Sequence, residues 1–316
     1  MAGLHPGRAR PGDRRLPAPE TPVRRAGRGW GRLKFLKRLA SGLVGGLIVF
    51  AVLYLGARYE IKWIAGFLIL AVAYPTAVEY IQLLRRLDIE LAAPEFLIWI
   101  PVLVFSYLVF NGRYADVVLL FAIAYQVLRY LRALPHRDGL FSAIAGVFGL
   151  LYIPWLLHYF YLIYIGAAGQ PPHVGGVNAL VVLLMVWGYD TGAYLIGSTI
   201  GRHKAFPNIS PNKTWEGVGG GFLFAFAGAI LGASLSPVWR EFAFHGGVHH
   251  LILSSFFVGL AVQLGDVFAS KLKRAAGVKD SGTFLPGHGG ALDRIDGLLF
   301  ALPVFYFYYH YVLGFF

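Results

Sequence analysis

Long apolar stretches recur along this chain, separated by short segments that carry charges or Gly and Pro. A helix needs roughly 20 mostly apolar residues to cross a bilayer, and each of these stretches is close to that length. Hydrophobic residues make up 57% of the chain and charged residues 14%, whereas soluble domains average about a quarter charged. The sequence therefore predicts an all-α, polytopic integral membrane protein.

Nine stretches after residue 40 are candidate transmembrane helices. The fifth is longer than a span requires and contains Pro154, so we expect that helix to tilt or break there. In the seventh, small residues recur every fourth position from Gly217 to Ala233, which predicts close packing against a neighbouring helix. The nine ranges are 41–57, 63–84, 92–110, 114–131, 140–166, 175–197, 217–236, 249–269 and 296–315.

Positive charge is distributed unevenly between the two sides of this arrangement. Of the 28 Lys and Arg residues, 24 fall on one side when the N-terminus is cytoplasmic, and four fall on the other. Positive residues are retained in the cytoplasm, so we expect a cytoplasmic N-terminus, with Phe316 outside. Residues 1–40, rich in Arg, Pro and Gly, are predicted to form a disordered cytoplasmic tail, and a signal peptide is the less favoured alternative.

Composition also removes several function classes. The absence of cysteine excludes disulfides, thiolate metal sites and cysteine nucleophiles. The net charge of +12 does not indicate nucleic acid, because the basic residues lie in loops beside apolar spans, where anionic lipid headgroups are the nearer partner.

The predicted inner loop over 265–296 combines four carboxylates with five basic side chains. Carboxylates suit Mg²⁺, and Lys and Arg neutralise phosphate charge that the metal leaves. Glycines on both sides of His288 allow sharp turns that present N–H groups to an anion. A simple positive anchor is the alternative, but a charge placed at a span end is costly unless it has a partner or a function. The charged residues are Asp266, Asp280, Asp293, Asp296, Lys271, Lys273, Arg274, Lys279 and Arg294.

The inner loop over 201–217 offers a second set of phosphate-binding groups. Lys213 and the hydroxyl groups of Ser210 and Thr214 are suited to hold nucleotide phosphate or sugar, although the loop lacks P-loop spacing. The alternative, that Ser210 to Asn212 is a turn and that Thr214 starts the following helix, stays open. Asp190 is a further ionisable residue inside a predicted span.

Residues 270–296 resemble the signature of the phosphatidate cytidylyltransferases, also called CDP-diacylglycerol synthases. Ala291 departs from it, because the family usually has a bulkier aliphatic residue there. The sequence around Asp190 and residues 210–217 are also similar to that family. The matching positions are Ser270, Lys273, Arg274, Lys279, Asp280, Gly282, Pro286, His288, Gly289, Gly290, Asp293, Arg294 and Asp296.

The resemblance implies that CTP and phosphatidate condense to CDP-diacylglycerol and pyrophosphate with Mg²⁺, at the cytoplasmic face of the inner membrane. Residues 41–170 would form N-terminal helices, and 171–316 the catalytic region. Asp266 and Asp293 would bind the metal, and Asp296 and Asp280 would support it or bind a second cation. The groups expected to bind substrate or phosphate are Ser210, Asn212, Lys213, Thr214, Ser270, Lys273, Arg274, Lys279, Gly289, Gly290 and Arg294. His288 would either bind phosphate or orient an aspartate, and the orienting role is favoured.

Two other functions remain as alternatives. A cation-coupled transporter would use intramembrane acids such as Asp190 and Asp266, but the charge here gathers at one face. A CTP-dependent enzyme acting on a different lipid is the nearer rival. The sequence also leaves a homodimer open.

Overall fold

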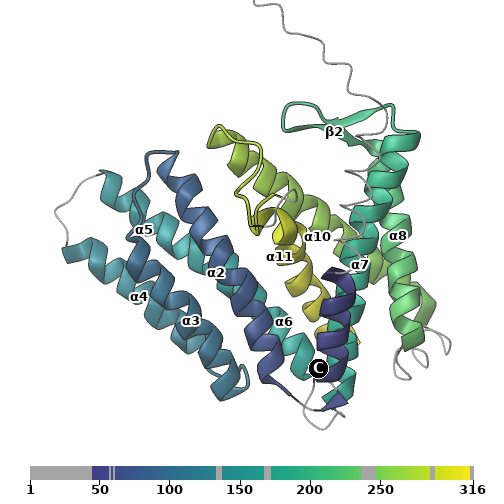
Figure 1. Ribbon diagram of the computed structural model, residues 1–316, viewed down its shortest axis with the longest axis horizontal. Coiled ribbons are helices and arrows are strands. Elements are labelled where there is room, and N and C mark those ends of the chain that lie inside the picture. The colour runs from purple at the N-terminus through teal and green to yellow at the C-terminus, as the bar shows by residue number, and fades with distance from the viewer. Residues whose placement is uncertain are drawn as a thin grey trace, which may run out of the picture. The chain divides into compact units, whose positions relative to one another are not determined.

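The computed structural model describes residues 45–56, 58–59, 61–132, 137–166, 172–235, 247–284 and 289–313, and most of these residues are helical (Figure 1). Residues 1–40 and Phe316 lie outside this set, so the predictions for the two termini are not tested. The elements are a helix at Gly45–Gly56, α2 (Trp63–Arg85), α3 (Ala93–Phe110), α4 (Ala115–Arg132), α5 (Arg137–Leu150), η1 (Leu151–Trp155), α6 (Leu156–Ile165), α7 (Pro172–Thr199), β1 (Lys204–Phe206), β2 (Ser210–Thr214), α8 (Trp215–Leu235), α10 (Val248–Ala275), α11 (Leu292–Phe307) and η3 (Tyr308–Val312).

Helical structure occurs at all nine predicted spans, which confirms the all-α membrane fold. Six of the described helices are long and apolar enough to cross a bilayer. The fifth predicted span is one of them, and its five residues from Leu151 to Trp155 form a π-helical turn around Pro154. Proline lacks the N–H of the regular helical bond and crowds the preceding turn, so the irregularity falls where it was expected. How many helices span the membrane stays a prediction.

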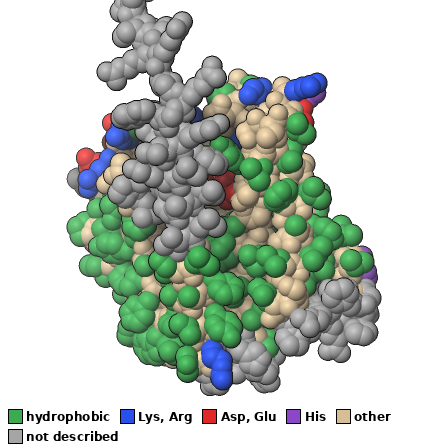
Figure 2. Space-filling view, turned by 45° about the vertical axis from the view of Figure 1, so that its right-hand side comes forward, with side chains coloured by type: hydrophobic (Ala, Val, Ile, Leu, Met, Phe, Trp, Pro, Cys, Tyr) green, Lys and Arg blue, Asp and Glu red, His purple; other side chains and the backbone are tan. Residues whose placement is uncertain are grey.

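The outer surface of the helices is apolar. Figure 2 shows hydrophobic side chains covering most of one face, with Lys and Arg at its upper and lower ends. Phe67, Leu120 and Leu131 are each about two-thirds exposed, at 65%, 65% and 68%. So much exposed apolar surface is unusual for a protein in water. It suits helices whose outer faces contact lipid chains.

Helices α7 and α8 pack against each other along their length. Ala225, Ala229 and Ala233 are buried, and a Cβ added at Gly217 would lie 2.8 Å from the Ala193 carbonyl oxygen. A side chain at Gly221 would meet the ring of Tyr189 at 2.7 Å. The repeated small residues of α8 therefore allow the close helix approach that the sequence predicted.

The two charged loops lie toward the same end of the helices. In the loop over 201–217, where the sequence predicted no strand, β1 and β2 form a short antiparallel hairpin with Lys204 opposite Thr214. The segment that connects α10 to α11 lies toward the same upper end in Figure 1. The fold thus brings both sets of phosphate-binding candidates to one side of the molecule.

Candidate active site

Asp293 lies in the first turn of α11 and uses both carboxylate oxygens. Its Oδ1 accepts a hydrogen bond from the Lys273 ammonium at 2.5 Å, and its Oδ2 accepts the N–H groups of Ser281 and Gly290, each at 2.9 Å. The two charged side chains are only 10% and 11% exposed. Burial opposes ionisation of Asp293, but the ammonium and N–H donors outweigh it and lower the pKa of this carboxyl group. Asp293 is therefore held as a carboxylate at the entry to α11.

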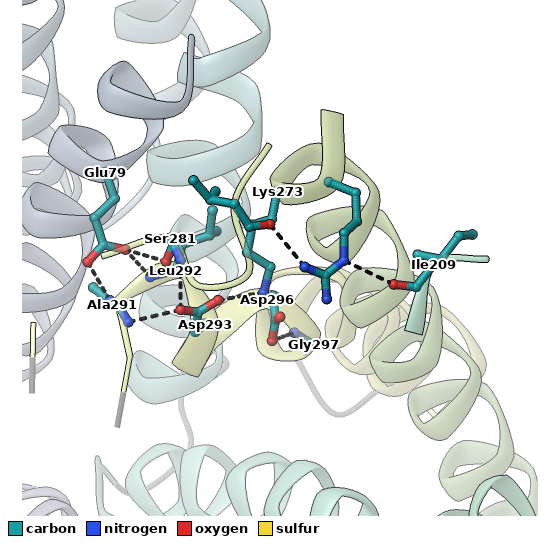
Figure 3. Close-up of polar contacts among 12 residues, drawn as sticks. Glu79, Ile209, Lys273, Ser281, Ala291, Leu292, Asp293, Asp296 and Gly297 are labelled. Carbon is teal, nitrogen blue, oxygen red and sulfur yellow. Dashed lines mark hydrogen bonds and ion pairs between the residues drawn. The ribbon is translucent and has the colours of Figure 1, made fainter. Parts of the chain in front are cut away.

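Glu79 of α2 holds the same loop from a distant part of the chain (Figure 3). Its Oε1 accepts the N–H of Ala291 at 2.7 Å, and its Oε2 accepts the N–H of Leu292 at 3.0 Å and the hydroxyl of Ser281 at 2.7 Å. The side chain is buried, at 6% exposure. The first N–H groups of a helix have no partner within the helix, and negative charge is favourable there. Glu79 therefore caps α11 from another helix.

Glycines allow this contact to form. A Cβ at Gly290 would overlap the Ser281 hydroxyl and the Glu79 carboxylate, and a Cβ at Gly282 would approach Glu79 to 2.5 Å. Gly289 has φ of +80°, a conformation that residues with side chains rarely adopt. The N–H of Gly290, which we expected to bind substrate, donates to Asp293 instead. These glycines therefore let the loop backbone pass close to the carboxylates of Glu79 and Asp293.

Asp266 and Asp296 form a second group of charges, where α10 meets α11. The two carboxyl groups interact directly with each other, and Asp190 of α7 acts on both electrostatically. Lys213 of β2 donates a hydrogen bond to Asp266 at 2.5 Å. A Cβ at Gly265 would overlap the backbone oxygen of Asp296, so the helices approach closely at this point. The fold therefore brings together three acids and a lysine from four separate elements.

The pair formed by Asp266 and Asp296 is the best candidate for a metal site. Among the described residues, no three His, Asp or Glu side chains are arranged to hold a metal ion together. Mg²⁺ usually binds through one or two carboxylates and keeps its other positions for water and substrate phosphate. Two facing carboxyl groups fit that requirement, because a cation between them removes their repulsion. Asp293, predicted as the second ligand, forms an ion pair with Lys273, and its role as a ligand stays a prediction.

Some polar side chains in and next to the hairpin hold the local structure, and one of them contacts the acidic group. The hydroxyl of Thr214 accepts the N–H of Gly217 at 3.2 Å, which is the helix-start role that the sequence left open. Arg274, expected to meet phosphate, donates to the carbonyl oxygens of Ile209 at 3.4 Å and Val278 at 3.1 Å, and so ties the hairpin to the end of α10. The ammonium of Lys213 remains the hairpin's contribution to the acidic group.

The contacts described above assign no role to the other predicted binding residues. Arg294, at the start of α11, acts electrostatically on Asp190. His288 lies outside the described residues. Of the remaining residues, three are exposed, namely Asn212, Lys279 and Asp280, and two are half-buried, namely Ser210 and Ser270.

The comparisons with known proteins show which family the chain belongs to. Residues 36–312 match the model of the cytidylyltransferase family. The chain belongs to that family. It is similar to proteins named phosphatidate cytidylyltransferase from Bacillus subtilis strain 168, at 38% identity over 157 residues, and Thermotoga maritima, at 41% over 160 residues. A third relative is the uncharacterized protein YnbB of Escherichia coli K12, at 40% over 138 residues.

These alignments cover only part of each protein. The matches to the two named enzymes include 50% of this chain and 54% and 55% of the relatives, and the match to YnbB includes 43% and 44%. The chain thus aligns with about half the length of the curated relatives. The family match, in contrast, covers nearly the whole chain.

Sequence reasoning missed Glu79 and Ser281. Glu79 carried a usable signal, because it is an ionisable residue inside the predicted span 63–84, which is a functional hypothesis by default. The same argument singled out Asp190, Asp266 and Asp293 but not Glu79. Ser281 carried no signal of its own, since a serine in a polar loop is ordinary.

Proposed function

We propose that this protein transfers a cytidylyl group from CTP to phosphatidate, giving CDP-diacylglycerol and pyrophosphate. The observation that carries the proposal is the pair of Asp266 and Asp296 flanked by Lys213, at one end of apolar helices, in a member of the cytidylyltransferase family. A lipid phosphate and a nucleoside triphosphate repel each other. Catalysis must therefore position both and neutralise their charge.

In the proposed reaction, a phosphate oxygen of phosphatidate attacks the α-phosphorus of CTP. The bond from that phosphorus to the oxygen bridging the α and β positions breaks, and pyrophosphate leaves with the electron pair. Lys213 would exchange Asp266 for a CTP phosphate, and Lys273 would likewise leave Asp293 for phosphate. Asp293, released from Lys273, would then be available as a ligand for a cation. No protein nucleophile is required.

We infer that Mg²⁺ is the cofactor and that Asp266 and Asp296 hold it, with Asp293 joining when Lys273 moves. The ion would stabilise charge on the triphosphate and on the leaving pyrophosphate. Asp280 and Asp190 are candidates for supporting a second cation. The inner membrane, with the site facing the cytoplasm, is the proposed location, because the basic loops gather at the end of the helices that holds the site.

The test is incubation of purified protein with labelled CTP and phosphatidate in detergent micelles. We expect labelled CDP-lipid and pyrophosphate in equal amounts, and neither when Mg²⁺ is omitted. Parallel reactions with diacylglycerol or another lipid alcohol test the rival substrate class. Product from those lipids but not from phosphatidate would assign a different substrate, and turnover without a divalent ion would contradict the role of the acidic pair.

A further inference from the structure

Tyr152 is a buried polar residue that the proposed reaction does not yet use. It lies in the π-helical turn η1 and is 3% exposed. Within the described part of the chain its hydroxyl has no hydrogen-bond partner. Burying a hydroxyl without a partner costs free energy, and π-helical turns within α-helices occur frequently at functional sites. Both features indicate that this hydroxyl has a hydrogen-bond partner when substrate is bound.

The surroundings of Tyr152 place it beside the acidic pair. Its ring packs edge-on against Phe268 of α10, with centroids 5.2 Å apart, and against Phe300 of α11, 6.2 Å apart. Phe268 lies two residues after Asp266, and Phe300 lies one helical turn after Asp296. The carboxyl groups of Asp296 and Asp266 both act electrostatically on the phenol. The unpartnered hydroxyl is therefore close to the proposed reaction centre.

We propose that the Tyr152 hydroxyl donates a hydrogen bond to a phosphate oxygen of the lipid substrate. This inference rests on the proposed function. Lys213 reaches the acidic pair from the polar hairpin, whereas Tyr152 reaches it from within a membrane-spanning segment, among the rings of Phe268 and Phe300. A substrate with acyl chains suits that apolar side better than a nucleotide does. A neutral donor can bind the phosphate there without burying another charge.

The test compares two Tyr→Phe variants that each remove one buried hydroxyl. Tyr161 of α6 is the matched control, since it is 0% exposed, also lacks a hydroxyl partner within the described residues, and has no acidic group acting on it. For Tyr152→Phe we expect the KM for phosphatidate to rise roughly tenfold or more, as for loss of a hydrogen bond to a charged group, with the KM for CTP unchanged. Tyr161→Phe should leave both KM values at those of the unaltered protein.

A binding measurement separates this inference from the proposed function. Phosphatidate added without CTP should raise the Tm of the unaltered protein and of Tyr161→Phe, and should raise that of Tyr152→Phe much less. Equal responses from the two variants, or a rise in KM for CTP alone, would overturn the assignment of Tyr152. If the unaltered protein makes no CDP-lipid, the proposed function fails. The phosphatidate-dependent shift in Tm still decides whether Tyr152 binds the lipid phosphate.

Discussion

The carboxylate of Glu79 accepts a hydrogen bond from the backbone N–H of Ala291 at 2.7 Å, across 212 positions of the sequence. Through this contact, helix α2 of the N-terminal region fixes the first turn of α11, which carries Asp293 and Asp296. The active-site loop is thus held by a helix that supplies no group to the proposed chemistry. Substitutions in α2 should therefore alter catalysis without touching substrate.

Glu79→Gln should lower both stability and turnover. A glutamine offers one acceptor oxygen where the carboxylate offers two, and its NH₂ group would face an N–H or hydroxyl donor. Each buried donor left without a partner costs about 1–3 kcal/mol. We expect a lower Tm and at least a tenfold lower kcat, with the KM for CTP less affected.

Glu95→Gln is the matched control for that variant. Glu95 pairs with Arg129 at 3.0 Å, but both side chains are about 40% exposed, at 37% and 43%. Exposed ion pairs contribute about 0–1 kcal/mol. This change should alter Tm and kcat little, and equal losses in the two variants would show that Glu79 has no particular role in holding the loop.

The sequence predicts the helices well because bilayer thickness and hydrophobicity constrain them locally. The positions of the apolar segments, the irregularity at Pro154 and the small-residue face of α8 all follow from short windows of sequence. The hairpin of β1 and β2 does not, because its residues read equally well as a polar loop. Along residues 204–206 and 210–214, apolar and polar side chains do not alternate clearly enough to indicate strands.

The site was predicted by residue type but not by pairing. Asp293 and Asp296 lie at the start of α11, whereas Asp266 lies inside α10, nine residues before its last residue, Ala275. No sequence pattern says that Asp266 interacts with Asp296 while Asp293 pairs with Lys273. Those pairings depend on how α10 and α11 cross. Tyr152 illustrates the same limit, because a phenol in an apolar helix looks like any core aromatic residue.

Gly265→Ala should separate α10 from α11 and reduce turnover. A Cβ at Gly265 would overlap the backbone oxygen of Asp296, and backbone cannot yield as a side chain can. Overpacking of this kind costs about 1–3 kcal/mol. Gly219→Ala in α8 is the control, since no atom lies within 4 Å of an added Cβ there. That substitution should keep activity and raise Tm slightly, whereas unchanged kcat in Gly265→Ala would argue against close approach of the two helices.

Asp293→Asn and Lys273→Met should each abolish turnover and lower Tm. Removing one partner of a buried ion pair costs about 3–5 kcal/mol, because the other charge is left buried and unpaired. The double variant leaves no unpaired charge, so its Tm should exceed that of either single variant while its activity stays absent. Thermal unfolding and a turnover assay on the four proteins measure this cycle. Full activity of Asp293→Asn would end the catalytic assignment of Asp293.

Single cysteines should establish which side of the membrane carries the site, since the chain has no cysteine of its own. Asn212 and Thr283 are exposed near the site and are suitable positions, whereas a cysteine at Gly282 would collide with Glu79. Tyr59, 68% exposed, lies in a segment predicted to face outward. With an impermeant maleimide, Asn212→Cys and Thr283→Cys should react only in inside-out vesicles, and Tyr59→Cys only in right-side-out vesicles. Labelling of Asn212→Cys in right-side-out vesicles would place the site on the outer side of the membrane, away from cytoplasmic CTP. That result would overturn the proposed orientation.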